Sequence, residues 1–293
     1  MSDIALPACV RVADEHGLAR LDIRTPVATA QVFLQGAQVT EWTPSHAAES
    51  VLWLSPRSVF APGKAIRGGV PICLPWFGAH PTDPAAPAHG FARLVEWSLV
   101  EAIDTDGIVT LVFRLQQATP RPDWPHPFRA TYRIAIGSTL MLALDVENIG
   151  TAAFTFQEAL HSYFAVTDVE RITITGLEGS DYLDKVDDFA RKSQRNDPIT
   201  FNGETDRVYL DTAATCRIAD PSNRRVITVE KSGSMSTVVW NPGRERGMAL
   251  TDVGDPGWRG MVCVETANVR DSAVRLEAGA THTMITTLRL TSI

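Results

Sequence analysis

Cysteine is scarce in this sequence of 293 residues, and the few copies lie far apart. Cys9, Cys73, Cys216 and Cys263 form no Cys-x-x-Cys pair, the spacing that structural zinc sites commonly use. We therefore expect reduced and mostly buried thiols, as in a cytoplasmic protein, and no structural metal.

Long apolar runs and clusters of positive charge are also missing. No segment approaches the roughly 18–20 apolar residues that a membrane-spanning helix needs, and residues 1–6 lack the basic and apolar regions of a signal peptide. The net charge is −7 and no basic run offsets it, which argues against a general nucleic-acid binder. A small anion could still be held by a few local arginines. These absences predict a cytoplasmic protein with no membrane or nucleic-acid partner.

The common catalytic and cofactor-binding motifs are absent as well. The sequence contains no GxGxxG, Walker A, GxSxG or HExxH motif. Helical periodicity is rare, and no linker rich in glycine, serine or proline divides the chain. The 44% of hydrophobic residues is ordinary for a globular protein and allows a sizeable core. We expect a single domain over residues 1–293.

Period-two alternation is what the sequence does contain. It is clearest over residues 131–148, where two alternating runs meet at Gly137-Ser138, a hairpin signature. Further strands are expected at 10–12, 18–23, 30–34, 51–54, 97–103, 108–115, 154–156, 172–174, 216–218, 226–229, 236–240, 273–276 and 281–290. Residues 181–192 have roughly helical spacing, so a short helix competes there with a loop. This pattern predicts an all-β fold, a large antiparallel β-sandwich with little helix.

A proline-rich stretch interrupts the strands. Residues 65–78 read Ala-Ile-Arg-Gly-Gly-Val-Pro-Ile-Cys-Leu-Pro-Trp-Phe-Gly, and His89-Gly-Phe-Ala-Arg93 follows shortly after. Proline at this spacing excludes a helix and an interior strand, so we expect a rigid loop that carries Arg67. Arg67 and Arg93 could be surface or ion-paired arginines, or could together capture a phosphate or carboxylate. His89 could bind a polar ligand or cap a turn.

Two polar residues stand where apolar residues are expected. His161 lies among aromatic and aliphatic neighbours and is either a core-edge histidine or a general acid. Glu265 follows a buried run over residues 261–264 and is either a solvated strand-end glutamate or a general base in a cleft. Asp206 by itself is typical of a loop aspartate.

Taken together, these segments resemble the aldose 1-epimerase (galactose mutarotase-like) superfamily, and within it the hexose-6-phosphate mutarotases. The matching blocks run in the family's order over about two hundred residues. They are Ile66–Gly78, His89–Arg93, Leu160–Phe164, Asp206–Tyr209, Val239–Pro242 and Val262–Val269.

The resemblance implies a supersandwich fold and a reaction that uses no metal and no cofactor. It also implies that His161 is the catalytic acid and Glu265 the catalytic base, on opposite sides of the sugar ring. The residues that it implies for holding the sugar hydroxyls or the phosphate are Arg67, His89, Arg93 and Asp206. The expected reaction interconverts the anomers of a phosphorylated hexose such as glucose 6-phosphate, in a monomer or weak homodimer.

One departure from the family pattern affects the anion site. The Trp-Asn-Pro block often continues with an aromatic residue and lysines, whereas this chain has Gly-Arg-Glu-Arg over residues 243–246. It is open whether Arg244 or Arg246 assists. Three alternative functions also stay open: an aldose 1-epimerase for unphosphorylated sugar, a carbohydrate-binding protein without catalysis, and a sugar-phosphate sensor.

Overall fold

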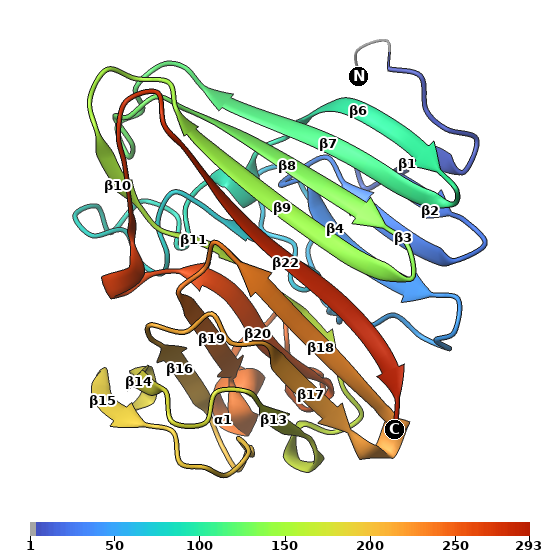
Figure 1. Ribbon diagram of the computed structural model, residues 1–293, viewed down its shortest axis with the longest axis vertical. Coiled ribbons are helices and arrows are strands. Elements are labelled where there is room, and N and C mark those ends of the chain that lie inside the picture. The colour runs from blue at the N-terminus through green and yellow to red at the C-terminus, as the bar shows by residue number, and fades with distance from the viewer. Residues whose placement is uncertain (1–3) are drawn as a thin grey trace.

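The computed structural model describes residues 4–293 and is built mainly of antiparallel strands. One eight-stranded sheet runs across the whole molecule (Figure 1). In spatial order its strands are β13 (Thr173–Thr175), β17 (Cys216–Asp220), β18 (Arg225–Ser232), β22 (Thr281–Ser292), β9 (Thr139–Asn148), β8 (Phe128–Ile136), β7 (Ile108–Gln117) and β6 (Ser98–Thr105).

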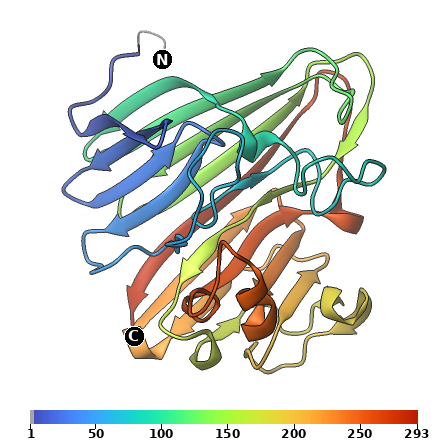
Figure 2. The same ribbon diagram turned by 180° about the vertical axis from the view of Figure 1, so that it is seen from behind.

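Two further sheets lie against this one, as the views from both sides show (Figures 1 and 2). A four-stranded sheet contains β1 (Val10–Glu15), β2 (Leu18–Arg24), β3 (Ala28–Phe33) and β4 (Gln38–Pro44). A second eight-stranded sheet has the order β15 (Ala190–Ser193), β14 (Asp181–Asp184), β16 (Thr205–Tyr209), β19 (Ser236–Asn241), β20 (Met261–Asn268), β11 (Glu158–Leu160) and β5 (Ile72–Cys73), with β12 (Tyr163–Ala165) also paired to β20. β10 (Phe154–Phe156) pairs with β21 (Val274–Leu276).

Helix is confined to short pieces. The one α-helix of the described residues is α1 (Gly243–Ala249). The 3-10 turns are η1 (Ala92–Leu94), η2 (Val169–Arg171), η3 (Lys185–Asp187), η4 (Pro221–Asn223), η5 (Gly257–Gly260) and η6 (Arg270–Ser272). The predicted antiparallel β-sandwich with little helix is therefore confirmed.

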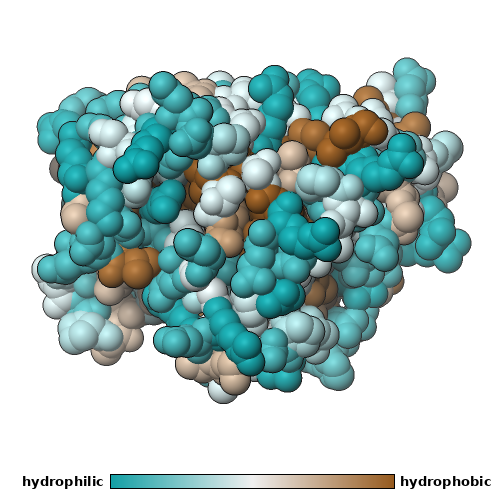
Figure 3. Space-filling view, turned by 90° about the horizontal axis from the view of Figure 1, so that it is seen from below, coloured by the Kyte–Doolittle hydropathy of each residue, from teal (hydrophilic) through white to brown (hydrophobic). Residues whose placement is uncertain are grey.

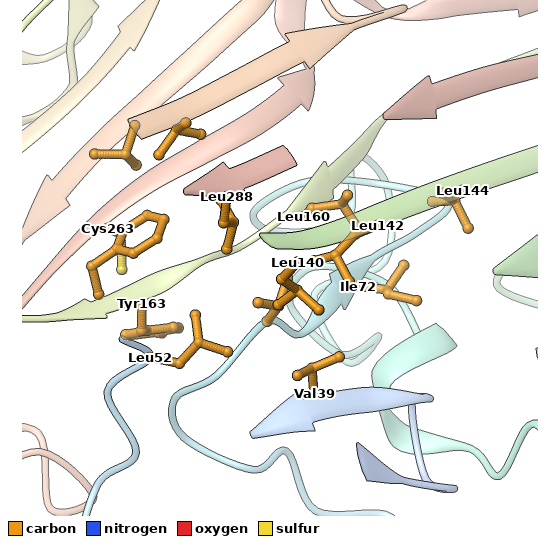
Figure 4. Close-up of a cluster of buried hydrophobic side chains, with 14 of the residues drawn as sticks. Val39, Leu52, Ile72, Leu140, Leu142, Leu144, Leu160, Tyr163, Cys263 and Leu288 are labelled. Atoms are coloured by element: carbon orange, nitrogen blue, oxygen red, sulfur yellow. The ribbon is translucent and has the colours of Figure 1, made fainter. Parts of the chain in front are cut away.

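The core lies between the sheets. Figure 4 shows Val39 of β4, Ile72 of β5, Leu142 of β9 and Leu288 of β22 converging there, and each is fully buried. The surface seen from below is mostly hydrophilic, with only small separate apolar patches (Figure 3). Burial of apolar side chains between sheets, at roughly 25 cal/mol per Å², is what holds the layers together. No helix among residues 4–293 is long and apolar enough to cross a membrane.

Two local predictions were wrong. Residues 181–192 are mainly a hairpin of β14 and β15, and only the short 3-10 turn η3 between these strands is helical. The periodic residues Val186 and Phe189 are 51% and 40% exposed, so their spacing does not mark a buried helix face. Residues 51–54 form no strand but only isolated bridges, because the segment is shared between two partners: Leu52 pairs with Phe164 of β12 and Leu54 with Gly68 of the proline-rich loop.

The proline-rich stretch is a loop that includes the two-residue edge strand β5, in agreement with the expected exclusion of an interior strand. Its prolines cannot donate hydrogen bonds, but their carbonyls accept them: Pro71 from the His161 amide at 3.0 Å and Pro75 from the Gln157 amide at 2.9 Å. The loop continues beyond this stretch to residue 93, and near its end Gly90, with φ +75°, approaches Leu74 closely. The loop is therefore joined to the second sheet and to itself through backbone contacts.

Gly90→Ala should destabilise the protein strongly, because the added Cβ would lie 1.9 Å from the Leu74 carbonyl oxygen. Gly63→Ala is the matched control, since Gly63 also has a positive φ of 73° but has nothing within 4 Å of that position. We expect a loss of about 1 kcal/mol for the control and about 3 kcal/mol or more for Gly90→Ala, measured by urea unfolding. Equal losses would show that the close approach does not matter.

Candidate active site

One face of the second eight-stranded sheet carries the candidate site. In the register of β16, β19 and β20, Asp206 lies opposite Trp240, and Val238 lies opposite Glu265. Because side chains alternate along a strand, Glu265 and Val264 point to opposite faces of the sheet, and Val264 joins the hydrophobic core. Every residue of β20 is buried, so this strand is covered on both faces.

A cleft of about 250 Å³ opens over this face. It is walled by residues from the sheet, the loop at 65–93, the β14–β15 hairpin and α1. Its polar and aromatic lining residues are Arg67, Phe77, His89, Arg93, His161, Tyr163, Lys185, Asp206, Trp240, Arg246 and Glu265. All six residues predicted from the sequence thus line one cavity.

His161 and Glu265 lie side by side in this cleft. His161 Nε2 is 3.4 Å from Glu265 Oε1, and the two residues are 6% and 1% exposed. The imidazole stacks on Tyr163, with ring centroids 4.8 Å apart and planes inclined by 11°. At 3.4 Å no pyranose ring fits between acid and base, so the expected placement on opposite sides of a sugar ring does not match this arrangement.

Burial shifts the proton affinities of this pair in opposite directions. The pKa of His161 is lowered well below its usual range, first by burial and then by the neighbouring His89, Arg93 and Arg67. The pKa of Glu265 is raised well above its usual range by burial, although Lys185 opposes the shift. At pH values between the lowered pKa of His161 and the raised pKa of Glu265, the pair holds one titratable proton. That proton can reside on His161 Nε2 or on the Glu265 carboxylate.

Arg67 reaches the cleft but is already paired. Its Nε donates to Asp252 Oδ2 at 2.9 Å, and its Nη1 donates to the Tyr163 hydroxyl at 2.9 Å. Burial works to lower the pKa of Arg67, but Tyr163 and Asp252 outweigh it and raise the pKa. The arginine is therefore held in one orientation beside Tyr163, the residue on which His161 stacks.

Arg93 differs from the other cations of the cleft. Its Nη2 donates to the Ala88 carbonyl at 2.8 Å, and its Nε is buried without a hydrogen-bond partner among the described residues. Arg67, Lys185 and Arg246 each form an ion pair with a carboxylate, whereas no described carboxylate lies within 4.0 Å of Arg93. Arg93 is thus the lining cation with unused capacity for an anion.

Asp206 lies on β16 and not in a loop, and it is 5% exposed. Its Oδ2 accepts from Lys185 Nζ at 2.6 Å, while its Oδ1 is buried and has no hydrogen-bond partner in the part of the chain that the structure describes. Burial raises the pKa of Asp206, and Lys185 opposes that rise. The sequence reasoning missed Lys185, because its approach to the cleft depends on the hairpin between β14 and β15.

Arg244, Arg246 and Tyr163 differ in their position relative to the cleft. Arg246, on α1, lines the cleft and pairs with Glu204, whereas Arg244 is exposed and does not line it. Tyr163 was also missed as a site residue, although it follows His161 by two positions in the same block. No group of three His, Cys, Asp or Glu side chains suited to a metal is found within residues 4–293.

The comparisons with known proteins concern the chain as a whole. The family model described as aldose 1-epimerase matches residues 20–289. Relatives named "Putative glucose-6-phosphate 1-epimerase" include one from Salmonella typhimurium, 40% identical over 82% of this chain and 80% of the relative, and one from Escherichia coli, 39% identical over 90% of each. A third, from Cenchrus ciliaris, is 36% identical over 85% of this chain and 78% of its own length.

Solved structures extend the likeness to the fold. A Salmonella typhimurium protein described as a "putative mutarotase (YeaD)" superposes with a TM-score of 0.91 at 32% identity, over 99% of this chain and 96% of its own. A galactose mutarotase-like protein from Clostridium acetobutylicum has a TM-score of 0.73 at 12% identity, over 97% and 98% of the two chains. The second likeness concerns the fold alone.

Glu265→Gln should stabilise the protein, and the gain should grow as the pH rises above 4.5. The folded-state pKa of Glu265 is raised, so the stability that its bound proton contributes is present at low pH and is lost on ionisation. A tenfold change in proton affinity between the folded and unfolded states corresponds to about 1.4 kcal/mol. Urea unfolding between pH 4.5 and 8 measures the effect, with exposed Glu277→Gln as the control. A difference that does not vary with pH would contradict the raised pKa.

Proposed function

The chain belongs to the aldose 1-epimerase family, and on this premise we propose that it interconverts the α and β anomers of a hexose 6-phosphate, with glucose 6-phosphate as the expected substrate. The observation that carries the proposal is a buried histidine–glutamate pair in the same cleft as an arginine that has no carboxylate partner among residues 4–293. The pair supplies proton transfer, and the arginine supplies a site for the phosphate. The relatives' names support the same substrate class.

The proposed chemistry begins with two proton transfers. Glu265 removes the proton of the C1 hydroxyl while His161 protonates the ring oxygen, and the C1–O5 bond breaks to give the open aldehyde. Rotation about C1–C2 exposes the other face of the aldehyde, and ring closure reverses both transfers. Since O1 and O5 are both bonded to C1, an acid and a base that serve them are expected to be neighbours. The 3.4 Å separation of His161 and Glu265 suits that requirement.

The single proton of the pair explains how buried groups can serve both roles. The reactive form needs the proton on His161 and the negative charge on Glu265, whereas burial favours the neutral arrangement. A bound phosphate would add negative charge to a cleft that contains Arg67, Arg93 and Lys185, and so would raise the proton affinity of His161. Substrate binding would therefore favour the reactive form.

His161→Ala and Glu265→Gln should each lower the rate of catalysed mutarotation by about 10²–10⁴, the usual contribution of one positioned acid or base. Exposed His16→Asn, at a turn between β1 and β2, is the matched histidine control and should keep the native rate. Polarimetry or NMR with pure α-glucose 6-phosphate measures the rate above the spontaneous one. Near-native activity in either site variant would refute the assigned role. Saturable sugar binding without acceleration in the native protein would indicate a binding protein instead.

Arg93→Ala should raise the KM for glucose 6-phosphate by about 10- to 100-fold, the loss expected for a hydrogen bond between charged groups. The effect on free glucose should be small, because that sugar has no phosphate to hold. Arg244→Ala removes a positive charge from exposed α1 without altering the lining, and it serves as the control. Equal losses on both sugars would show that Arg93 does not hold phosphate. A native enzyme equally fast on free glucose would favour the neutral-sugar epimerase.

A further inference from the structure

One side of the His89 ring is occupied by two hydrogen-bond partners. The backbone N–H of Gly78 donates to His89 Nδ1 at 3.4 Å, and the Sγ atom of Cys73 lies 3.4 Å from the same nitrogen. Cys73 is fully buried on β5, at the end of the sheet that carries the site. Its thiol forms no other hydrogen bond within residues 4–293.

These two contacts determine where the proton of His89 resides. A backbone N–H can only donate, so His89 Nδ1 must be the acceptor for Gly78. If Nδ1 carried a hydrogen, that hydrogen would face the N–H of Gly78, which is also a donor, and the hydrogen bond between Gly78 and His89 could not form. With Nδ1 as an acceptor, the contact to Cys73 must be an S–H donating to nitrogen, and the single ring hydrogen of neutral His89 belongs on Nε2.

The remaining contacts hold the ring so that Nε2 faces the cleft. The His89 amide donates to the Gly78 carbonyl at 2.7 Å, which closes a two-way bridge between these residues. Phe77 packs against the ring in an edge-to-face contact, with centroids 4.7 Å apart and planes at 89°. Nε2 has no hydrogen-bond partner among the described residues and is not among the buried unpartnered atoms, and His89 lines the cleft.

We propose that Cys73 is a positioning residue, whose thiol donates to His89 Nδ1 and so fixes His89 as a neutral imidazole that presents an Nε2–H donor to a substrate oxygen. This rests on the proposed function only for the identity of that oxygen, which belongs to a sugar hydroxyl or to the phosphate. The tautomer itself follows from the Gly78 and Cys73 contacts.

A neutral His89 also matters for His161. The two rings lie 5.6 Å apart, and a positive His89 would make protonation of His161 harder. Burial, then Arg93, Lys185 and Arg67, lower the pKa of His89 to about 3, which agrees with a neutral ring. Burial raises the pKa of the Cys73 thiol, so the thiol keeps the hydrogen that it donates. Cys73 thus influences the acid–base pair through His89.

The tautomer can be tested without any catalytic assay. Two-dimensional ¹H–¹⁵N spectra of ¹⁵N-histidine-labelled full-length protein at pH 7, assigned with His89→Gln, distinguish the Nε2–H form, the Nδ1–H form and the cation. We expect the Nε2–H form in the native protein. In Cys73→Ala we expect a measurable Nδ1–H population beside it, because only the long 3.4 Å contact from the Gly78 N–H then opposes that form. A native His89 found as the Nδ1–H form or as the cation would overturn the proposal, whatever the protein's substrate is.

Mutarotation of glucose 6-phosphate then tests the consequence. Cys73→Ala should lower kcat about five- to tenfold, the range for loss of one neutral hydrogen bond, and Cys73→Ser should restore most of the rate because its hydroxyl can donate. Cys216→Ala, at another buried free cysteine remote from the cleft lining, controls for lost volume and should stay within about twofold of the native rate. Equal losses in Cys73→Ala and Cys216→Ala, or no rescue by serine, would refute the positioning role. Failure of the native protein to accelerate mutarotation would count against the proposed function and leave the spectra to decide the tautomer.

Discussion

The contact between His161 and Glu265 is the interaction on which the rest of the site depends. Two titratable side chains lie 3.4 Å apart in a setting that excludes most water. Burial makes charge on either group costly, so the pair retains one proton between them. Such a pair is useful only if the surroundings can shift that proton at the right moment. The remaining side chains of the cleft provide the charges that do so.

These surrounding charges are not equivalent. Arg67, Lys185 and Arg246 each have a carboxylate partner, which limits their net field and fixes their orientation. Arg93 has no such partner within residues 4–293, so an anion bound there, as proposed, would bring negative charge into the cleft without displacing an existing carboxylate. His89 stays neutral because burial and these cations lower its pKa to about 3, and a neutral ring does not oppose protonation of His161. Within the described part of the chain, the cleft thus combines one cation that has no carboxylate partner, Arg93, with three cations that are ion-paired and a neutral His89.

The backbone makes this arrangement possible. The loop at 65–93 passes so close to neighbouring strands that Gly69 has room for no side chain, since a Cβ there would lie 2.1 Å from the Val39 carbonyl oxygen. The prolines of this loop supply carbonyls to His161 and Gln157, which anchors the loop to the strand that leads to His161. A loop held at several points by its backbone can present Arg67 and His89 in fixed positions.

The sequence by itself determined the all-β class, most strand positions, the irregular loop and six residues that prove to line one cleft. Period-two alternation and proline chemistry are local, and they can be read from neighbouring residues. Only the tertiary structure decided the 3.4 Å contact, the ion pairs that distinguish Arg93 from Arg67, and the arrival of Lys185 from the β14–β15 hairpin. These depend on strand pairing between distant segments. β20 shows why the sequence alone is not enough. Because this strand is buried on both faces, its polar and apolar residues do not alternate, and the sequence cannot assign Glu265 to the cleft face and Val264 to the core.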